Sequence, residues 1–469
     1  MPEKNKPYDI AVIGGGPAGY IAAIKGSMLG GKVILFEKDT VGGTCLNRGC
    51  IPTKAYLKTA EYIRNIQHAN KRGIRLKSTE FTLDMKEVAE NKNQVVKKLT
   101  DGVSGLLNSH SVEIIKSSAS IKSQTQVSAG GKIYEAKSII ICAGSEAGIL
   151  PIPGAADNPD VITSDGILEL TDLPKRLVVI GGGVIGCEMA CAFSAFGSDV
   201  TIIEFEDRLV PTMDGDVSME IKKALEQQGV TILTSKKASK IDSNKDANLV
   251  YLDGGKEPIL ADKVLISVGR SANLDCLGQL KERIKTQHGY ISVNDQMQTN
   301  IPNIYAAGDI NGKYMLAHAA FKMGETAAAN AMGHTEVCNL SHVPGCIYTL
   351  PEAASVGMTE QSARKLSDVS VGLFHFRSNG RSLACGETAG FVKVIIDKKY
   401  GEILGVHIVG ASATELIQEA VNLMAMEITA HEAADIIHGH PTYSEAFMEA
   451  CADALERCLH LPPKQTGAA

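Results

Sequence analysis

The sequence predicts an α/β fold with two Rossmann-like units followed by a C-terminal α+β domain. Three observations support this prediction. A strand, a glycine-rich turn, a helix and a second strand follow one another twice, at residues 8–37 and 176–204. Each copy is followed by a later strand that runs into glycine, at residues 139–144 and 264–269. From residue 346 onward the pattern changes to strands and helices without such a turn.

The two copies form an internal repeat with constant spacing. Each marked position of the second copy lies 167 residues after its counterpart in the first. The glycines are Gly14, Gly16 and Gly19 in the first copy and Gly181, Gly183 and Gly186 in the second. Each copy ends in an acidic residue, Glu37 or Glu204, 23 residues after its first glycine.

This spacing is typical of turns that bind dinucleotides. The first glycine permits the tight turn, the second lets the backbone approach a pyrophosphate, and the third lets helix and strand pack closely. The helix N-terminus presents unpaired N–H groups to the phosphates, and the acidic residue can accept hydrogen bonds from ribose hydroxyls. A single such string would be weak support among 46 glycines, but two in the same context favour two nucleotide sites. Two dinucleotides suggest hydride transfer between a flavin and a nicotinamide.

The chain length of 469 residues favours two to four domains. Segments rich in proline, glycine or polar residues suggest boundaries at 150–154 and 270–277. The predicted domains are two nucleotide-binding domains at residues 1–147 and 148–272, a central domain at 273–343 and an interface domain at 344–469.

Later segments add further expectations. Residues 303–309 read NIYAAGD, and Asp309 either belongs to an ordinary turn or binds a sugar-like chain of a cofactor. In the last domain we expect antiparallel strands at residues 391–396 and 403–409, and helices at 413–426 and 443–458. This domain has no nucleotide-binding turn, so substrate binding or subunit contact is left for it.

Composition excludes several classes of function. The net charge is −6, and 47 basic and 53 acidic residues are mixed along the chain, so we expect no nucleic-acid partner. Apolar runs do not approach the roughly 20 residues that span a bilayer. Residues 1–7 leave no room for a signal peptide, so we expect a cytoplasmic protein. Eleven scattered cysteines do not resemble a secreted disulfide framework.

One pair of cysteines differs from the others. Residues 42–54 read GGTCLNRGCIPTK, which places Cys45 and Cys50 on either side of a turn. A structural disulfide is poorly motivated, since so short a loop removes only about 2 kcal/mol of chain entropy. A metal site lacks the usual cysteine spacing, and we expect no metal. A reversible redox disulfide is the favoured interpretation, and Lys54 either supports its thiolate or is an ordinary solvated lysine.

Such a disulfide needs a base that forms the substrate thiolate. His440 stands out among 12 histidines because Glu445, five residues later, could orient its imidazole. The same residues also fit a helix start with Thr442 as N-cap and Glu445 completing a capping box. On spacing alone, His431 and His438 are alternatives.

With these motifs the sequence resembles the pyridine nucleotide–disulfide oxidoreductases. The motifs HPTYSE and NIYAAGD narrow the resemblance to the dihydrolipoamide dehydrogenases of that family. The likeness covers nearly the whole chain, in the order YDIAVIGGGPAG, GGTCLNRGCIPTK, VVIGGGVIGCE, YTLPEAASVGMTE and HPTYSEAF. It implies an enzyme that oxidises dihydrolipoamide and reduces NAD through FAD and a redox-active disulfide.

The resemblance also implies how the cofactors bind. FAD is expected on the first glycine turn, with Lys54, Gly144 and Asp309 as further contacts. NAD is expected on the second turn with Glu204, and Gly269 occupies the place in the second unit that corresponds to Gly144.

The resemblance further implies catalytic roles. Glu188 is expected to form an ion pair with the lysine beside the flavin. Cys45 is expected to meet the substrate, and Cys50 to lie against the isoalloxazine ring. His440, oriented by Glu445, is expected to be the acid–base residue and to come from the other subunit of a homodimer.

The sequence leaves two alternative functions open. The expected partners are lipoyl domains of 2-oxoacid dehydrogenase-type or glycine cleavage complexes, but another NAD(P)H-dependent disulfide reductase is an alternative. Glutathione reductases bind NADPH through arginines near the second acidic residue, whereas residues 204–207 here read EFED and would repel a 2′-phosphate. Arg208 is the nearest cation. A purely structural subunit is the second alternative, which the cysteine pair and His440 argue against.

Overall fold

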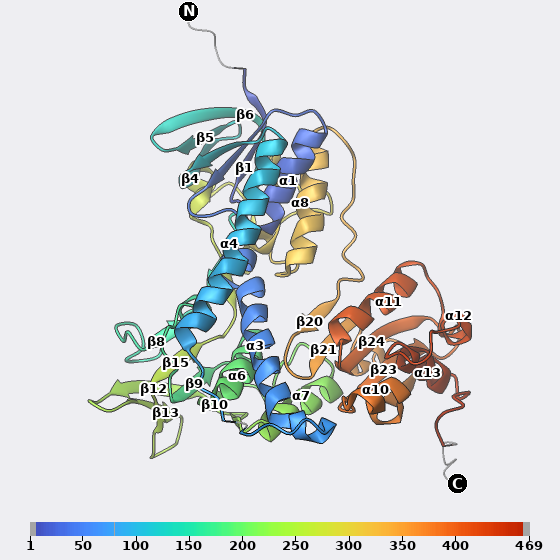
Figure 1. Cartoon of the computed structure of the whole chain (residues 1–469). Coiled ribbons are helices and arrows are strands. Elements are labelled where there is room, and N and C mark those ends of the chain that lie inside the picture. The colour runs from blue at the N-terminus through green and yellow to red at the C-terminus, as the bar shows by residue number, and fades with distance from the viewer. Residues whose placement is uncertain (1–5, 79, 463–469) are drawn as a thin grey trace, which may run out of the picture.

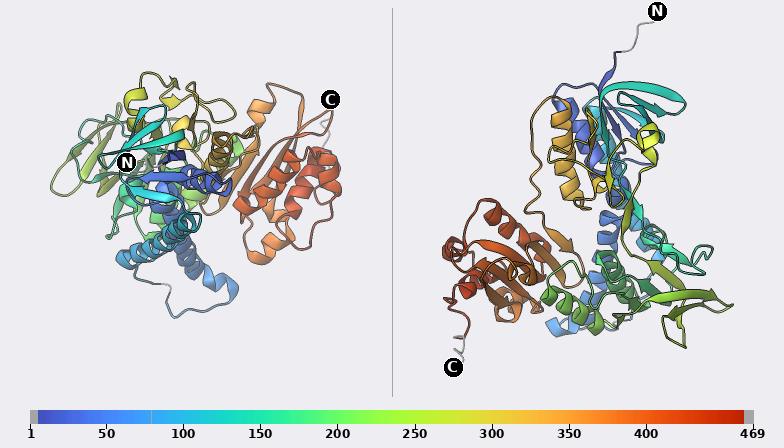
Figure 2. Two further views of the ribbon diagram at one scale, coloured as in Figure 1. Left: turned by 90° about the horizontal axis from the view of Figure 1, so that it is seen from above. Right: turned by 180° about the vertical axis from the view of Figure 1, so that it is seen from behind.

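The computed structural model describes residues 6–78 and 80–462 and has three parts (Figure 1). One α/β domain lies at the top of this view, a second lies below it, and the C-terminal domain lies beside the second. Views from above and behind show the C-terminal domain standing to one side (Figure 2). Residues 1–5, where no signal peptide is expected, lie outside the described residues. No helix in the described ranges is long and apolar enough to cross a membrane.

A parallel sheet forms the centre of the first domain, in the order β3-β2-β1-β6-β19. Its strands are β1 (Tyr8–Ile13), β2 (Val33–Glu37), β3 (Glu113–Lys116), β6 (Lys132–Ile141) and β19 (Ile304–Ala306). The central strands are buried on both faces, and their sequences are therefore continuous apolar runs. The first half of β6 instead pairs with an antiparallel hairpin of β4 (Ala119–Ser123) and β5 (Gln126–Ala129).

Residues 273–343 complete this first domain. They contribute β19 to its sheet and α8 (Ala317–Ala331), which packs beside α1 (Pro17–Met28) (Figure 1). Their other elements are short: η2 (Asp275–Leu280), β17 (Thr286–Gln287), β18 (Tyr290–Ile291) and η3 (Asp309–Asn311). The two helices come close because Gly324 of α8 lies against the backbone of Ala18.

The second domain repeats the topology of the first, as the internal repeat predicts. Its parallel sheet has the order β11-β10-β9-β15-β8, in which β10-β9-β15 corresponds to β2-β1-β6. The strands are β8 (Val161–Thr163), β9 (Arg176–Ile180), β10 (Asp199–Ile203), β11 (Thr231–Leu233) and β15 (Lys263–Ile266). The helices are α5 (Ser164–Ile167), α6 (Val184–Phe196) and α7 (Gly215–Gln227), and an antiparallel sheet contains β12 (Ala238–Ser243), β13 (Asn248–Leu252) and β14 (Ile259–Ala261).

Two sets of elements connect these domains. Where the chain leaves the first domain and returns to it, β7 (Ser145–Ala147) pairs with β16 (Arg270–Ala272). The other connection is helical, with α2 (Gly43–Arg48), α3 (Cys50–His68), η1 (Ala69–Arg72) and α4 (Met85–Ser109). The Tyr56 ring of α3 packs against Phe193 and Phe196 of α6. The helix that begins at Cys50 is therefore fixed against the second domain.

The C-terminal domain contains an antiparallel sheet in the order β20-β21-β24-β23-β22. Its strands are β20 (Gly345–Ile347), β21 (Glu352–Gly357), β22 (Val369–His375), β23 (Phe391–Asp397) and β24 (Ile403–Gly410). The helical elements are α9 (Glu360–Ala363), η4 (Phe376–Ser378), α10 (Gly380–Cys385), α11 (Ala413–Ala425), α12 (Ala430–Asp435) and α13 (Glu445–Ala454). The two strands and the first helix expected here are confirmed. α11 and α13 share a buried core with the sheet, while α7 of the second domain contacts β24.

The prediction for the last helix is wrong at both ends. α13 begins at Glu445, its N-cap residue is Ser444, and no side chain caps it. Only half of the expected capping box forms, because the Thr442 hydroxyl donates instead to the Gly439 carbonyl oxygen at 2.7 Å. The helix ends at Ala454, shortly before Glu456 adopts a φ of 60°, which an α-helix cannot continue.

Replacing Gly324 by alanine should lower the thermal unfolding midpoint. A Cβ there would lie 2.2 Å from the Ala18 oxygen, and overpacking of this kind costs about 1–3 kcal/mol. Gly102→Ala in α4 is the matched control, because nothing lies within 4 Å of its Cβ and alanine gains up to about 1 kcal/mol in a helix. Equal midpoints for the two variants, followed by circular dichroism, would contradict the close approach of α1 and α8.

Candidate active site

The first glycine turn has the geometry that a bound pyrophosphate requires. Gly14 has a φ of +99°, and a Cβ there would lie 2.3 Å from the Cys142 carbonyl oxygen. A Cβ at Gly19 would lie 1.8 Å from the Gly14 oxygen, so the helix and strand pack too closely for any side chain. Around Gly16 the nearest atom to a Cβ is 3.6 Å away, in Gly43. The second glycine therefore leaves room for a ligand.

The second turn repeats this geometry. Gly181 has a φ of +107°, and its Cβ would lie 2.6 Å from the Ser267 oxygen. A Cβ at Gly186 would lie 2.0 Å from the Gly181 oxygen, whereas nothing lies within 4 Å of a Cβ at Gly183. Gly183 is also the N-cap of α6 and has no side-chain cap, so the first N–H groups of the helix face this open space. Both turns thus fit the pyrophosphate of a dinucleotide.

The acidic residue of each copy holds its own glycine turn. Glu37 accepts hydrogen bonds from the N–H groups of Gly15 at 2.7 Å and Asp39 at 2.8 Å. Glu204 does the same for Gly182 at 2.5 Å and Glu206 at 2.7 Å. Each carboxylate retains lone pairs for a ribose hydroxyl. This structural contribution of the two acids was not predicted from the sequence.

Three further predicted cofactor contacts lie near the connection between the domains. Gly144 and Gly269 have φ values of +69° and +109°, and a Cβ on either would meet open space. Asp309 begins η3 and accepts a hydrogen bond from the Ser145 hydroxyl at 2.5 Å. The Ser145 oxygen in turn accepts one from Arg270 at 2.8 Å. Ser145 and Arg270 were not predicted as site residues, because neither belongs to a motif that indicates a cofactor contact.

The two cysteines of the pair lie at a helix boundary and contact each other. Cys45 is in α2, and Cys50 is the first residue of α3, where the helix dipole favours a negative charge. The hydrogen bond from Cys45, supported by the Lys54 cation and opposed by burial, lowers the pKa of Cys50 to about 7. The same hydrogen bond, together with burial, raises the pKa of Cys45. Of the two thiols, the surroundings therefore favour ionisation of Cys50.

Lys54 lies one helical turn after Cys50 and forms the ion pair that the resemblance implies. Its Nζ is 3.0 Å from Oε1 and 3.1 Å from Oε2 of Glu188, which α6 contributes. Glu188 is buried and also accepts a hydrogen bond from the Tyr348 N–H at 2.9 Å. The Tyr348 ring lies 4.3 Å from the Lys54 ammonium. Tyr348 was missed as a site residue, although it lies within the YTLPEAASVGMTE motif.

Of the candidate bases, His440 has the most suitable geometry. Its Nδ1 is 2.8 Å from one oxygen of Glu445, whose other oxygen accepts the Thr442 N–H at 2.7 Å. Although burial opposes it, these hydrogen bonds lower the pKa of Glu445, which is therefore ionised at neutral pH. Because a carboxylate only accepts hydrogen bonds, Nδ1 carries the proton and Nε2 has the free lone pair of a base. The His440 side chain is 78% exposed.

The other two candidate histidines are less suited to this role. His438 is 6% exposed, and its ring nitrogens contact Glu419 at 2.7 Å and the Ile436 carbonyl oxygen at 2.9 Å. The hydrogen bond to Glu419 raises the pKa of His438 despite burial. Within the described ranges, His431 has no hydrogen-bonded carboxylate on its ring. Neither ring combines a free nitrogen with an orienting acid.

The structure does not bring His440 and the cysteine pair together within one chain. His440 precedes α13 on the C-terminal domain, whereas Cys50 begins α3, and Figure 1 shows these helices in different parts of the molecule. Across residues 6–78 and 80–462, no group of three or more histidine, cysteine, aspartate or glutamate side chains is arranged to hold a metal.

Residues 8–324 match the family model described as pyridine nucleotide-disulphide oxidoreductase. The chain belongs to this family. Residues 343–451 match the dimerisation domain of the same family, which supports a homodimer. The predicted α/β fold and the family resemblance are therefore confirmed, and as a member of the family the chain is an oxidoreductase that uses FAD and NAD.

Similar proteins cover almost the entire chain. A dihydrolipoyl dehydrogenase of Bacillus subtilis is 40% identical over 96% of this chain and 99% of its own length. Dihydrolipoyl dehydrogenase 1 of Arabidopsis thaliana mitochondria is 38% identical over 97% of this chain and 91% of its own. Among solved structures, the HOCl-induced flavoprotein disulfide reductase RclA of Escherichia coli has a TM-score of 0.85 at 27% identity, covering 94% of this chain and 99% of its own.

Replacing Cys45 by alanine should raise the pKa of Cys50 above about 7 in the reduced protein. The variant loses the S–H donor, and a hydrogen bond to a charged group contributes about 1.5–3 kcal/mol, which corresponds to a shift of at least about one pH unit. The pH dependence of Cys50 alkylation by iodoacetamide measures this shift. Cys451→Ala, at a buried cysteine of α13, serves as control, and an unchanged midpoint in Cys45→Ala would refute the assignment of the thiolate.

Proposed function

We propose that this chain is a dihydrolipoyl dehydrogenase that oxidises dihydrolipoamide and reduces NAD. The observation that carries the proposal is the position of Cys50, which begins α3 one turn before the lysine of the Lys54–Glu188 ion pair and whose pKa these surroundings lower. FAD, held on the first glycine turn with Lys54, Gly144 and Asp309, would supply an electron-pair acceptor for Cys50 and a hydride donor for NAD. The relatives from Bacillus subtilis and Arabidopsis thaliana carry this activity in their names.

The chain's own residues account for the thiol chemistry. His440 Nε2 takes a proton from one thiol of dihydrolipoamide, and the thiolate attacks Sγ of Cys45 in the Cys45–Cys50 disulfide. The Cys45–Cys50 bond breaks, a mixed disulfide forms, and Cys50 leaves as a thiolate. The second substrate thiol then attacks the mixed disulfide and releases lipoamide. His440 gives its proton to the departing Cys45 sulfur, in keeping with the raised pKa of Cys45, and takes the proton of the second substrate thiol, which it then loses to solvent.

The ion pair beside the cysteines has a defined role in this scheme. The Lys54 ammonium stabilises the Cys50 thiolate, while the buried Glu188 carboxylate balances the charge of the lysine. The Tyr348 N–H fixes the carboxylate from the C-terminal domain. The pair therefore keeps the region around the thiolate close to neutral.

The pattern of charge favours NAD over NADP. Glu204 is followed by Glu206 and Asp207, and these carboxylates would repel a 2′-phosphate. Arg208, the nearest cation, donates to the Pro211 carbonyl oxygen at 3.0 Å. The Arg208 guanidinium is therefore bound within its own loop, and the carboxylates determine the charge that a 2′-phosphate would meet.

The partners and location belong to the same proposal. A homodimer would supply His440 of one subunit to the cysteine pair of the other. Lipoyl domains of 2-oxoacid dehydrogenase-type or glycine cleavage complexes would supply the substrate. A cytoplasmic location suits the nine cysteines outside the pair, which are unpaired in the structure, because a reducing compartment keeps such thiols free.

An assay of NAD reduction by dihydrolipoamide tests the proposed activity directly. We expect turnover with NAD, at least about tenfold lower kcat/KM with NADP, and loss of turnover in Cys50→Ser because the electron route is interrupted. Cys458→Ser is the matched control, since its thiol donates to Glu449 at 2.9 Å in the C-terminal domain and serine can replace that donor. Turnover that survives in Cys50→Ser, or none in the unchanged protein, would refute the function.

Mixed dimers test whether the site is shared between subunits. His440→Gln alone should lower kcat by about 10²–10⁴, the usual contribution of a general base. A heterodimer of one Cys50→Ser and one His440→Gln subunit should recover activity, because one of its two sites combines the intact cysteines with the intact histidine. Co-expressing the two tagged chains and purifying the heterodimer gives the measurement. Activity no higher than in either homodimer would show that both groups act within one subunit.

A further inference from the structure

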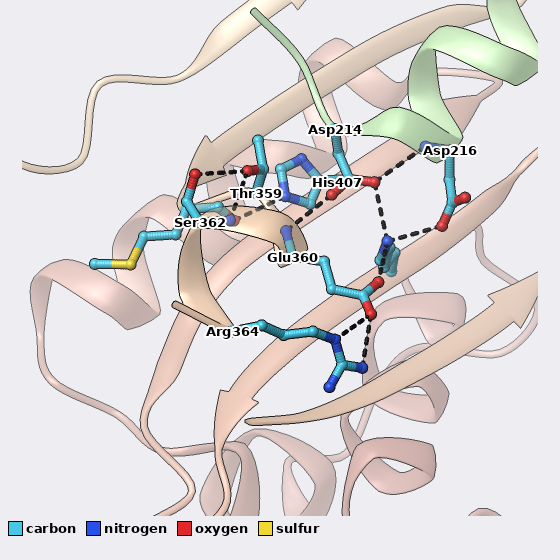
Figure 3. Close-up of polar contacts among 9 residues, drawn as sticks. Asp214, Asp216, Thr359, Glu360, Ser362, Arg364 and His407 are labelled. Atoms are coloured by element: carbon cyan, nitrogen blue, oxygen red, sulfur yellow. Dashed lines mark hydrogen bonds and ion pairs between the residues drawn. The ribbon is translucent and has the colours of Figure 1, made fainter. Parts of the chain in front are cut away.

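A buried lysine of the C-terminal domain holds the second domain at the start of α7. Lys393 lies on β23, its side chain is 3% exposed, and its Nζ contacts Asp214 at 2.9 Å, Asp216 at 2.7 Å and Glu360 at 2.6 Å. Figure 3 shows these three acidic side chains and Arg364 in one connected network. Asp214 and Asp216 belong to the second domain, whereas Glu360 begins α9 of the C-terminal domain. The network therefore crosses the boundary between the domains.

Asp214 is the point at which this network meets the nucleotide-binding domain. It is the N-cap residue of α7, and its Oδ1 accepts the Asp216 N–H at 3.1 Å. Its Oδ2 accepts the Glu360 N–H at 2.9 Å. Its side chain is 3% exposed, so both of its oxygens are fixed without help from solvent. The residue is held from the C-terminal domain by a backbone N–H and by the Lys393 ammonium.

Asp214 also ends the segment that supports the second glycine turn. We call residues 205–214 the nucleotide loop. The Val210 N–H donates to the Gly182 carbonyl oxygen at 2.9 Å. Leu209 packs so closely on Gly182 that a Cβ there would lie 2.4 Å from its side chain. Gly182 in turn donates its N–H to Glu204. The loop thus fixes the turn that would receive the NAD pyrophosphate.

The nucleotide loop has a conformation that needs support from both ends. Val210 has a φ of +42°, a strained value for a β-branched residue, and such residues persist only where the surrounding structure determines them. One support is the hydrogen bond to Gly182. The others reach the Val210 oxygen from the Met213 N–H at 2.9 Å and from the Ser218 hydroxyl at 3.5 Å. Both donors depend on the place of Asp214, because Met213 directly precedes it and the Ser218 N–H donates to its carbonyl oxygen at 3.1 Å.

We propose that Lys393 is a positioning residue for pyridine-nucleotide binding. By holding Asp214 it fixes the nucleotide loop, and through Val210 the loop keeps the Gly182 turn in the shape that accepts the nucleotide. This inference rests on the proposed function, in which the second turn binds NAD. It assigns to the C-terminal domain a contribution to the nucleotide site of its own chain.

The test compares two buried lysines that both join the second domain to a neighbour. Lys393→Met removes the ammonium of the network. Lys92→Met is the matched control, because Lys92 is 1% exposed and donates from α4 to the Leu168 carbonyl oxygen at 2.7 Å and to Glu169 at 3.2 Å, neither of which lies in the nucleotide loop. Titration calorimetry of the FAD-loaded dimer with ADP-ribose, the redox-inactive part of NAD, measures affinity without turnover. Hydrogen exchange of the peptide that contains Val210 measures the loop.

We expect Lys393→Met to weaken ADP-ribose binding by at least about fivefold, the lower end of usual coupling between sites, and to speed exchange at Val210. The KM for NAD should rise, while the rate of flavin reduction by dihydrolipoamide stays unchanged. Lys92→Met should change neither affinity nor exchange. Equal affinities in the two variants would overturn the inference even if both unfold at lower temperature.

Should Lys393→Met fail to fold, Asp214→Asn decides the matter, because it removes the charge that Lys393 holds while asparagine can still cap α7. It should weaken ADP-ribose binding in the same direction, and unchanged affinity would overturn the inference. The proposed function fails differently, since the unchanged protein would then show no NAD reduction with dihydrolipoamide.

Discussion

The balance of charge around Cys50 is the constraint on which the rest of the site depends. The Cys50 thiolate must form near neutral pH, yet the nucleophilicity of a thiolate falls as the pKa of its thiol falls. A very low pKa would therefore give an abundant but unreactive thiolate. The start of α3, the Cys45 thiol and Lys54 favour the thiolate, whereas burial and the Glu188 carboxylate oppose it. These opposing effects place the pKa of Cys50 at about 7, close to neutral pH. Packing of α3 on α6 keeps these opposing groups at fixed distances.

The internal repeat shows that one turn geometry serves two sites. In both copies the first and third glycines are required by close backbone contacts, and the acidic residue holds the residue after the first glycine. The acid therefore has a structural role before any nucleotide binds. A ribose hydroxyl would meet a carboxylate whose orientation two backbone N–H groups have already fixed. Preorganisation of this kind lowers the cost of binding.

Sequence spacing predicted those parts of the fold and site that depend on local backbone geometry. Each glycine turn with its two flanking strands, and the pairing of His440 with Glu445, lies within a short segment, where residue type and distance along the chain determine contact. The start of the last helix was predicted wrongly because Thr442 bonds to Gly439 instead of capping the helix, and its end because Glu456 adopts a positive φ. The Lys393 network could not be predicted, since its members come from positions 214, 216, 360 and 393 and meet only when two domains pack together.

The C-terminal domain has no nucleotide-binding turn, yet on the proposals above it acts on both halves of the reaction. His440 lies on this domain with an exposed ring, oriented by Glu445 but remote from the cysteines of its own chain, so its chemistry requires a second copy. Lys393 lies on the sheet of the same domain and acts on the nucleotide loop of its own chain. Dimerisation would then complete the thiol site, because His440 of one subunit meets the cysteines of the other. Packing of the C-terminal domain on the second domain would fix the nucleotide site within each chain. Loss of either contact should impair a different half-reaction, which distinguishes this domain from a passive interface.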